Sequence, residues 1–290
     1  MASRQEKLVG SAPVDDPQPL DASAADEPPA PEGLQAEQEL TAAQEAAEPS
    51  EGADSATPAR KGGHFRHEVL AVVFQVRDKR LHVLMWQRAQ APFEGRWALP
   101  GGPLGADERL GTSLGRHLAA KVDLTDVDHL EQLETRSDPD RDPREREVAT
   151  AYLALISTEL DPAIPADTAW HPVESLPPSA FDHASIIQSA RERLRAKLTY
   201  TNAGFALAPP TFTIAELRDI YAACIGHPVA ATNLQRVLTR RGVIEPTRGT
   251  VQRGTAGGRP AALYRFARSS LVVTDPFAVF RPPAAGAVSL

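Results

Sequence analysis

Cysteine is almost absent from the sequence, which has only Cys224 in 290 residues. A single thiol excludes an internal disulfide framework and is typical of a reducing compartment. Cys224 follows Leu217, Ile220 and Tyr221 at helical spacing. That spacing predicts a buried core residue rather than a nucleophile.

Long apolar segments are also missing. No apolar run approaches the roughly 20 residues that are needed to span a bilayer. Residues 1–7 lack the apolar core of a signal peptide. We therefore expect a cytoplasmic protein without a membrane partner.

Aromatic and β-branched residues are scarce in residues 1–60, which are rich in Ala, Pro, Glu and Asp. Such a segment buries too little apolar surface to offset its ordering entropy, so we predict a disordered acidic tail over residues 1–62. Two roles stay open for it: a solubilising leader, or a polyanion that competes with DNA for a basic surface of the same chain. Residues 269–290 are expected to form a flexible C-terminal tail.

The net charge of −7 is divided unevenly along the chain. Residues 1–60 hold 13 acidic and 3 basic side chains, and residues 61–198 hold 21 acidic and 18 basic ones. Residues 199–290 hold 4 acidic and 10 basic side chains, a net of +6. This basic segment predicts a polyanionic partner.

Residues 63–200 alternate between strand and helix patterns. A β-branched apolar run at 69–76 predicts a central strand, and a paired strand follows at 81–87. The remaining expected elements are strands at 97–99, 126–136, 148–157 and 170–173 and helices at 110–122 and 181–198. This order predicts an α/β domain, an α/β/α sandwich with a mixed sheet.

A glycine turn precedes the helix predicted at 110–122. Gly102, Glu108 and Arg116 have the spacing of the Nudix box, G-x5-E-x7-R-E-U-x-E-E-x-G-U, in which U is a bulky apolar residue. Magnesium needs hard oxygen ligands, which the Glu residues of that motif supply. In this chain the three further Glu positions and the late Gly position are occupied by His117, Ala120, Lys121 and Asp123. The resemblance therefore predicts a vestigial Nudix box with no catalytic residue and no metal site.

An active Nudix hydrolase of a nucleoside diphosphate derivative such as ADP-ribose is the alternative. It would need metal-binding carboxylates from elsewhere in the domain, such as Glu131, Glu134, Glu145 or Glu147. A protein-interaction module that binds neither DNA nor nucleotide is a third class, and the basic C-terminal segment argues against it.

Residues 201–268 have the pattern of a winged helix-turn-helix domain. A linker is expected at 199–210, followed by a helix that begins with a capping box of Thr213 and Glu216. A second helix is expected at 232–241, and a strand at 262–266 closes a glycine-rich wing. Asn and Arg read base edges in the major groove, and Arg also binds phosphates. The candidate DNA-binding residues of the second helix and the wing are Thr232, Asn233, Arg236, Arg240, Arg241, Arg248, Arg253 and Arg259.

Six short segments, each weak alone, are specific in their combined order and spacing: 92–102, 141–144, 181–183, 198–201, 212–217 and 258–266. Through them, residues 64 to about 268 resemble the NrtR family of Nudix-related transcriptional regulators of NAD metabolism. The resemblance implies a homodimeric repressor that binds a double-stranded DNA operator. A dimer of this kind reads an inverted repeat. It also implies release by ADP-ribose or a related nucleotide, which is an effector and not a cofactor.

The same resemblance implies an effector cleft in the Nudix-like domain. From the residues alone, Phe93 and Trp97 are also compatible with core packing, and Arg141 and Arg144 with a solvated loop of local ion pairs. The residues that the resemblance places near the ligand are Arg88, Phe93, Trp97, Gly101, Gly102, Arg141 and Arg144.

Overall fold

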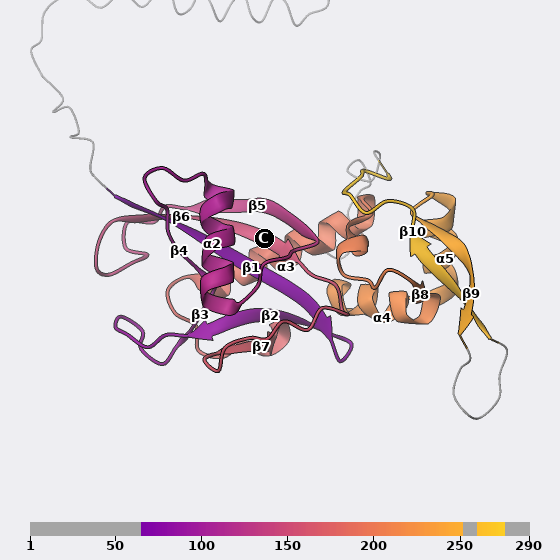
Figure 1. Ribbon diagram of the computed structural model, residues 1–290, viewed down its shortest axis with the longest axis horizontal. Helices are drawn as coiled ribbons and strands as arrows, with labels where there is room; N and C mark the ends of the chain where they lie inside the picture. Colours follow the sequence, from indigo (N-terminus) through magenta and orange to yellow (C-terminus); the bar gives the residue numbers. More distant parts are fainter. Residues whose placement is uncertain (1–64, 252–259, 276–290) are drawn as a thin grey trace, which may run out of the picture. The chain divides into compact units, whose positions relative to one another are not determined.

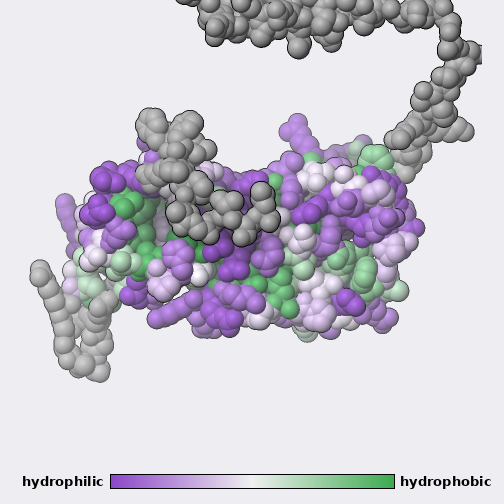
Figure 2. All heavy atoms as spheres, turned by 180° about the vertical axis from the view of Figure 1, so that it is seen from behind, coloured by the Kyte–Doolittle hydropathy of each residue, from purple (hydrophilic) through white to green (hydrophobic). Residues whose placement is uncertain are grey.

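The computed structural model describes residues 65–251 and 260–275. The tail predicted over residues 1–62, and the wing residues Arg253 and Arg259, lie outside these ranges. Within them, no helix is both long enough and apolar enough to cross a membrane. Large apolar side chains are seldom exposed there, and Figure 2 shows one face of the described surface as a mixture of hydrophilic and smaller hydrophobic areas.

A seven-stranded sheet is the centre of the first domain. Strand β1 pairs in parallel with β6 and antiparallel with β2 and β4, so the predicted mixed sheet is confirmed. Residues 69–74 of β1 are buried on both faces, as their continuous apolar run predicted. The strands are β1 (Arg66–Arg77), β2 (Arg80–Gln87), β3 (Trp97–Ala98), β4 (Gly101–Pro103), β5 (His129–Arg136), β6 (Glu147–Leu155) and β7 (Thr168–Pro172).

Two helices cover the two faces of this sheet (Figure 1). Helix α2 (Leu110–Val122) packs on the face that carries Val69 and Val73, while α3 (His183–Tyr200) packs on the face that carries Val72 and Phe74. Successive side chains of a strand point to opposite faces, so β1 supplies both layers. The predicted α/β/α sandwich is confirmed, and a short 3-10 turn, η1 (Val173–Ser175), joins β7 to the segment before α3.

The winged helix follows α3. Helix α4 (Ile214–Ile225) begins with the predicted capping box, in which Thr213 accepts from the Glu216 amide and Glu216 accepts from the Thr213 amide. Gly226, with φ of +81°, ends α4, and α5 (Ala231–Arg240) follows. Strands β8 (Phe212–Thr213), β9 (Ile244–Val251) and β10 (Ala261–Phe266) form a three-stranded sheet in the order β8-β10-β9.

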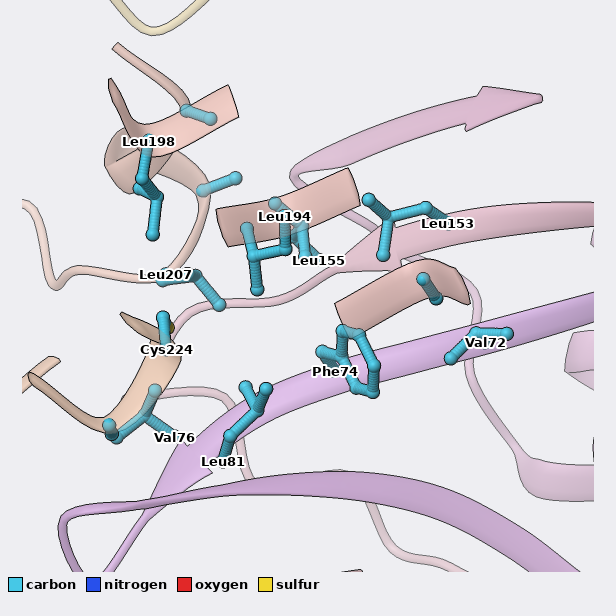
Figure 3. Close-up of a cluster of buried hydrophobic side chains, with 14 of the residues drawn as sticks. Val72, Phe74, Val76, Leu81, Leu153, Leu155, Leu194, Leu198, Leu207 and Cys224 are labelled. Atoms are coloured by element: carbon cyan, nitrogen blue, oxygen red, sulfur yellow. The ribbon is translucent and has the colours of Figure 1, made fainter. Parts of the chain in front are cut away.

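The segment 199–210 is not the linker that the sequence predicted. It contains a 3-10 helix, η2 (Ala203–Ala206), and Leu207 is fully buried. Leu207 belongs to one hydrophobic cluster with Phe74 of the sheet, Leu194 of α3 and Cys224 of α4 (Figure 3). We call this cluster the shared core. Because alanines and leucine replace the polar residues of a true linker, the segment packs between the Nudix-like domain and the winged helix.

Residues 269–275 also differ from the prediction of a flexible tail. The Asn202 side chain donates to the Ser270 carbonyl at 2.9 Å and accepts from the Val272 amide at 2.7 Å. The amides of Thr274 and Asp275 donate to the Tyr200 carbonyl at the end of α3. These bonds hold the segment against the end of α3 and the connecting segment, and the rest of the predicted tail lies outside the described residues.

Candidate functional site

The Gly-Gly turn is fixed by close packing. Strand β4 runs so near β1 that a Cβ atom on Gly101 would lie 2.1 Å from the Val69 carbonyl oxygen. A Cβ atom on Gly102 would lie 2.4 Å from the His117 ring. Both positions therefore require glycine for the fold itself.

Glu108 occupies its Nudix-box position, but both of its carboxylate oxygens accept hydrogen bonds from neighbouring residues. Its two carboxylate oxygens accept from Arg116 at 2.6 and 2.7 Å, and one of them also accepts from the Gly105 amide at 3.1 Å. These bonds, chiefly the one from Arg116, lower the pKa of Glu108 to about 2. The pair closes the loop in front of α2, so Glu108 and Arg116 have a structural role here.

The other Nudix-box positions supply no carboxylate. His117 is buried, with Nε2 3.0 Å from the Pro103 carbonyl oxygen, and burial lowers its pKa. Ala120 is exposed on α2, and the Lys121 ammonium lies 4.7 Å from the centre of the Trp86 ring. Asp123 takes the left-handed conformation, φ +51°, that the late glycine would adopt. Three or more metal-binding side chains come together nowhere in ranges 65–251 and 260–275, and this donor set does not fit a divalent metal.

Cations and aromatic rings gather beside α2. The Arg88 guanidinium carbon lies 4.9 Å from the centre of the Phe181 ring and 5.9 Å from that of Trp86. The Phe181 ring also contacts Phe93, with 4.9 Å between ring centres, and Arg144 at 6.0 Å. We call this set the cation–aromatic cluster: Trp86, Arg88, Phe93, Lys121, Arg144 and Phe181.

Two members of the cluster have strained backbones. Phe93 has a φ of +65° and Phe181 a φ of +50°, and such values are rare for bulky side chains. Strain of this kind costs about 1–3 kcal/mol per residue and often occurs at ligand sites. It explains why α3 begins at His183 and not at the predicted residue 181, because Phe181 cannot continue the helix.

Arg141 is placed differently from the sequence prediction. Its side chain is 1% exposed and lies 2.5 Å from Glu147, 2.9 Å from Asp182 and 3.8 Å from Glu68. This geometry does not support a direct ligand contact, since three carboxylates surround the guanidinium. Arg141 instead joins the 137–147 loop to the start of α3.

Arg144 and Trp97 fit the predicted cleft to different degrees. Arg144 is exposed and pairs with Asp142 at 2.6 Å while it faces Phe181. The Trp97 ring contacts His171 of β7 at 4.2 Å and packs against the shared core. The packing interpretation therefore describes Trp97 better than ligand stacking does.

Sequence reasoning missed Trp86, Lys121 and Phe181 as members of the site. Trp86 is two residues before Arg88, which was a usable signal. The rings of Phe181 and His183 have centres 5.3 Å apart, and His183 Nδ1 accepts from the Leu99 amide at 2.9 Å. Burial lowers the pKa of His183 to about 3, so this neutral ring connects α3 to the strand before the Gly-Gly turn.

A second surface lies on α5. The side chains of Thr232, Asn233, Arg236 and Arg240 are exposed on this helix, and Arg248 is exposed on β9. Arg236 donates to the Asn233 side chain at 2.7 Å, which brings two base-reading groups together. Residues 252–259, with the predicted Arg253 and Arg259, are not among those described.

Arg241 does not belong to this surface. Its guanidinium is 2.5 Å from Asp275 and 2.8 Å from the Thr199 carbonyl oxygen, and its side chain is 13% exposed. This geometry does not support the prediction that Arg241 binds DNA. No sequence pattern indicates that Asp275, 34 residues further along the chain, lies against Arg241.

Together, a Nudix-like α/β/α fold and a winged helix with an exposed polar helix define a class of ligand-responsive DNA-binding regulators. The family model of the NUDIX domain matches residues 65–190, and that of the NrtR DNA-binding winged helix domain matches residues 204–266. The chain belongs to the NrtR family of transcriptional regulators.

Proteins similar to this chain include transcriptional regulators and a pyrophosphatase. The ADPR responsive transcriptional repressor NtrR of Acinetobacter baylyi is 36% identical over 213 residues, 67% of this chain and 79% of the relative. The structure of Shewanella oneidensis NrtR complexed with a 27mer DNA is similar, with a TM-score of 0.60 and 35% identity over 69% of this chain and 92% of that one. An ADP-ribose pyrophosphatase of Methanocaldococcus jannaschii is 33% identical over 38% of this chain and 66% of its own length.

Proposed function

We propose that this protein is a homodimeric transcriptional repressor that leaves its operator when it binds ADP-ribose or a related nucleotide. The observation that carries the proposal is that one chain combines the cation–aromatic cluster with an exposed polar face on α5, in two domains that share a buried core. The similarity to a repressor that responds to ADPR supports it. We place the protein in the cytoplasm and assign it no cofactor.

The cluster has the chemistry that a dinucleotide-like ligand needs. Arg88 and Arg144 offer planar donors to phosphate oxygens, and the Phe93 and Phe181 rings offer faces to a base. Gly101 and Gly102 are buried, and they act by letting β4 pack against β1 and His117. Arg141 acts by holding the 137–147 loop in place.

On DNA, α5 occupies the major groove of each half-site. Asn233 and Arg236 read base edges, while Thr232, Arg240, Arg248, Arg253 and Arg259 bind backbone or groove positions. A dimer of winged helices reads an inverted repeat with half-sites about one or two helical turns apart. The ligand favours a dimer geometry that no longer matches this spacing, so ligand and DNA bind preferentially to different states.

An electrophoretic shift tests the proposal. DNA from upstream of the protein's own gene and its neighbours is mixed with the full chain at low salt, where phosphate contacts are strongest. We expect a shift that ADP-ribose reverses. A shift that ADP-ribose leaves unchanged contradicts the effector assignment, and no shift contradicts the regulator itself.

The second candidate is a Nudix hydrolase of ADP-ribose, favoured by the similarity to a pyrophosphatase. The carboxylates it would need are all in ion pairs: Glu131 with Lys197, Glu134 with Arg136, Glu145 with Arg66 and Glu147 with Arg141. We therefore propose that the domain is not an enzyme. Magnesium-dependent turnover of ADP-ribose that Glu108→Gln abolishes would establish the hydrolase instead.

A further inference from the structure

We propose that Lys121 takes the place of the divalent cation of a Nudix site, so that this protein binds the diphosphate of its effector without metal. The inference rests on the proposed function, since it concerns the same cleft. It concerns a ligand class, nucleoside diphosphate sugars, whose paired phosphates elsewhere call for a metal ion or an equivalent positive charge.

The position of Lys121 in the last turn of α2 supports this proposal. It occupies a Glu position of the Nudix-box pattern, on the C-terminal half of α2. Its ammonium lies over Trp86, at 4.7 Å from the ring centre, and the indole nitrogen of Trp86 donates to the Leu99 carbonyl at 3.1 Å. The ring is therefore fixed, and it holds the ammonium next to the strand that leads into the Gly-Gly turn.

Arg88 lies over the same Trp86 ring. Its guanidinium lies 5.9 Å from the centre of Trp86, so one indole is shared by two cations. Among the residues that the structure describes, neither Lys121 nor Arg88 forms an ion pair with a carboxylate. Two more deeply buried cations of the domain, Arg141 and Lys197, are paired with carboxylates.

The desolvation of Lys121 and Arg88 also supports the proposal. Burial lowers the pKa of both Lys121 and Arg88, which means that their charged forms are poorly solvated. Arg88 Nε donates to the Pro92 carbonyl oxygen at 2.9 Å, but within the described part of the chain neither cation is neutralised by an ion pair. A poorly solvated charge that no anion neutralises is costly, and an anion that enters the site removes this cost. Lys121 offers three N–H donors and Arg88 a planar set, which is suited to two adjacent phosphates.

The remaining Nudix-box residues leave no room for a metal in the same role. Glu108 is bound to Arg116 and the Gly105 amide, and His117 is packed against Gly102. Glu68 is the one nearby carboxylate that influences Lys121, and it also lies 3.8 Å from Arg141. At this Nudix-box position the positive charge of Lys121 would repel a divalent ion.

The experiment is a calorimetric titration of the full chain with ADP-ribose, in EDTA and in magnesium. We expect the same affinity in both buffers for the natural sequence. Lys121→Met should weaken binding about 10- to 100-fold in both, the loss of one charge-assisted contact. Lys121→Glu should bind weakly in EDTA and regain affinity in magnesium, because it returns a carboxylate to the motif position.

The matched control is Lys79→Met, which removes the same charge from a side chain that is 75% exposed on the turn between β1 and β2. It should bind ADP-ribose as the natural sequence does. Operator DNA is shifted by all variants if they are folded, and this is checked in parallel. A Lys121→Met protein that shifts DNA and binds ADP-ribose with unchanged affinity overturns the proposal and leaves the proposed function intact.

Binding by the natural sequence that disappears in EDTA also overturns the metal-free site alone. If the natural sequence binds ADP-ribose in neither buffer, the effector assignment and this inference fall together. The two failures are therefore distinguished within one set of titrations.

Discussion

At the scale of single residues, the site is organised by charges that are buried to different degrees. Arg141 is enclosed by Glu68, Glu147 and Asp182, while Lys121 has no such partner among the described residues. Two similar side chains therefore have opposite roles: one holds the loop in place, and the other is available to an anion.

Glu68 makes the stability of the protein depend on pH. Burial and the neighbouring Glu147 raise its pKa from 4.5 to about 7, while Arg141 and Lys121 oppose the shift. Between pH 4.5 and about 7, Glu68 keeps its proton in the folded chain but has released it in the unfolded chain. The free energy of unfolding therefore falls as the pH rises through this range. Glu68→Gln should raise the free energy of unfolding by about 1–3 kcal/mol at pH 8 and by little at pH 5.

Urea denaturation at the two pH values measures this effect. Glu145→Gln is the control, because Glu145 is exposed and paired only with Arg66. A gain of equal size at both pH values would show that Glu68 acts through packing and not through its proton.

Arg241 offers a second test at this scale. Its pair with Asp275 is largely buried, with side-chain exposures of 13% and 11%. Arg241→Ala and Asp275→Ala should each lower the free energy of unfolding by about 1–3 kcal/mol, and the double variant should lose little more. If only Arg241→Ala weakened operator binding at full stability, Arg241 would be a DNA contact after all.

At the scale of elements, α5 combines a buried side with an exposed polar side. Its inner side is anchored by buried Leu234 and Leu238 and by Gln235, which donates to the Tyr264 hydroxyl at 2.8 Å. Its outer side presents Asn233 and Arg236. Helix and wing are thus held together while the polar face stays exposed.

Arg236→Ala tests the role of α5. It should weaken operator binding by about 1–3 kcal/mol, the usual value of one specific base contact, and leave ADP-ribose affinity unchanged. Arg80→Ala, an exposed arginine of β2 that pairs with Glu174, is the control and should alter neither. Gel shifts and calorimetry give both numbers. Loss of both functions in the α5 variant would contradict the separation of the two surfaces.

Most elements were predictable because their patterns are local. Helix α2 has the predicted bounds, and the capping box of α4 was read from Thr213 and Glu216 alone. The parts that failed depend on distant partners: the 199–210 segment is ordered by the shared core, and Arg241 by a residue 34 positions away. At the candidate ligand site, the sequence located the Gly-Gly turn and Arg88, but only the fold brings Phe181 and Lys121 close to Arg88 and Trp86.

At the scale of the whole molecule, the two domains are built around one interior. Phe74 of the sheet, Leu207 of the connecting segment and Cys224 of α4 belong to the same buried cluster. Burial also raises the pKa of the Cys224 thiol to about 12, which confirms the prediction of an unreactive core residue. The two domains are therefore in direct contact through this cluster.

Leu207→Ala should lower the free energy of unfolding of the whole chain by about 2–5 kcal/mol. All three tryptophans lie in the Nudix domain, so their fluorescence reports that domain, while operator binding reports the winged helix. We expect both signals to be lost at the same urea concentration. Leu176→Ala, a partly buried neighbour of the core, should cost less. Two separate transitions would show that the domains unfold independently.

The shared core also limits how this protein can be re-engineered. Exchanging one DNA-binding domain for another, to obtain a regulator with a new operator, assumes that the domains fold independently. In this protein, such an exchange would remove residues that belong to the hydrophobic core shared with the Nudix-like domain. A successful chimera would have to carry 199–210 and 269–275 along with the new helices, or rebuild the seam residue by residue.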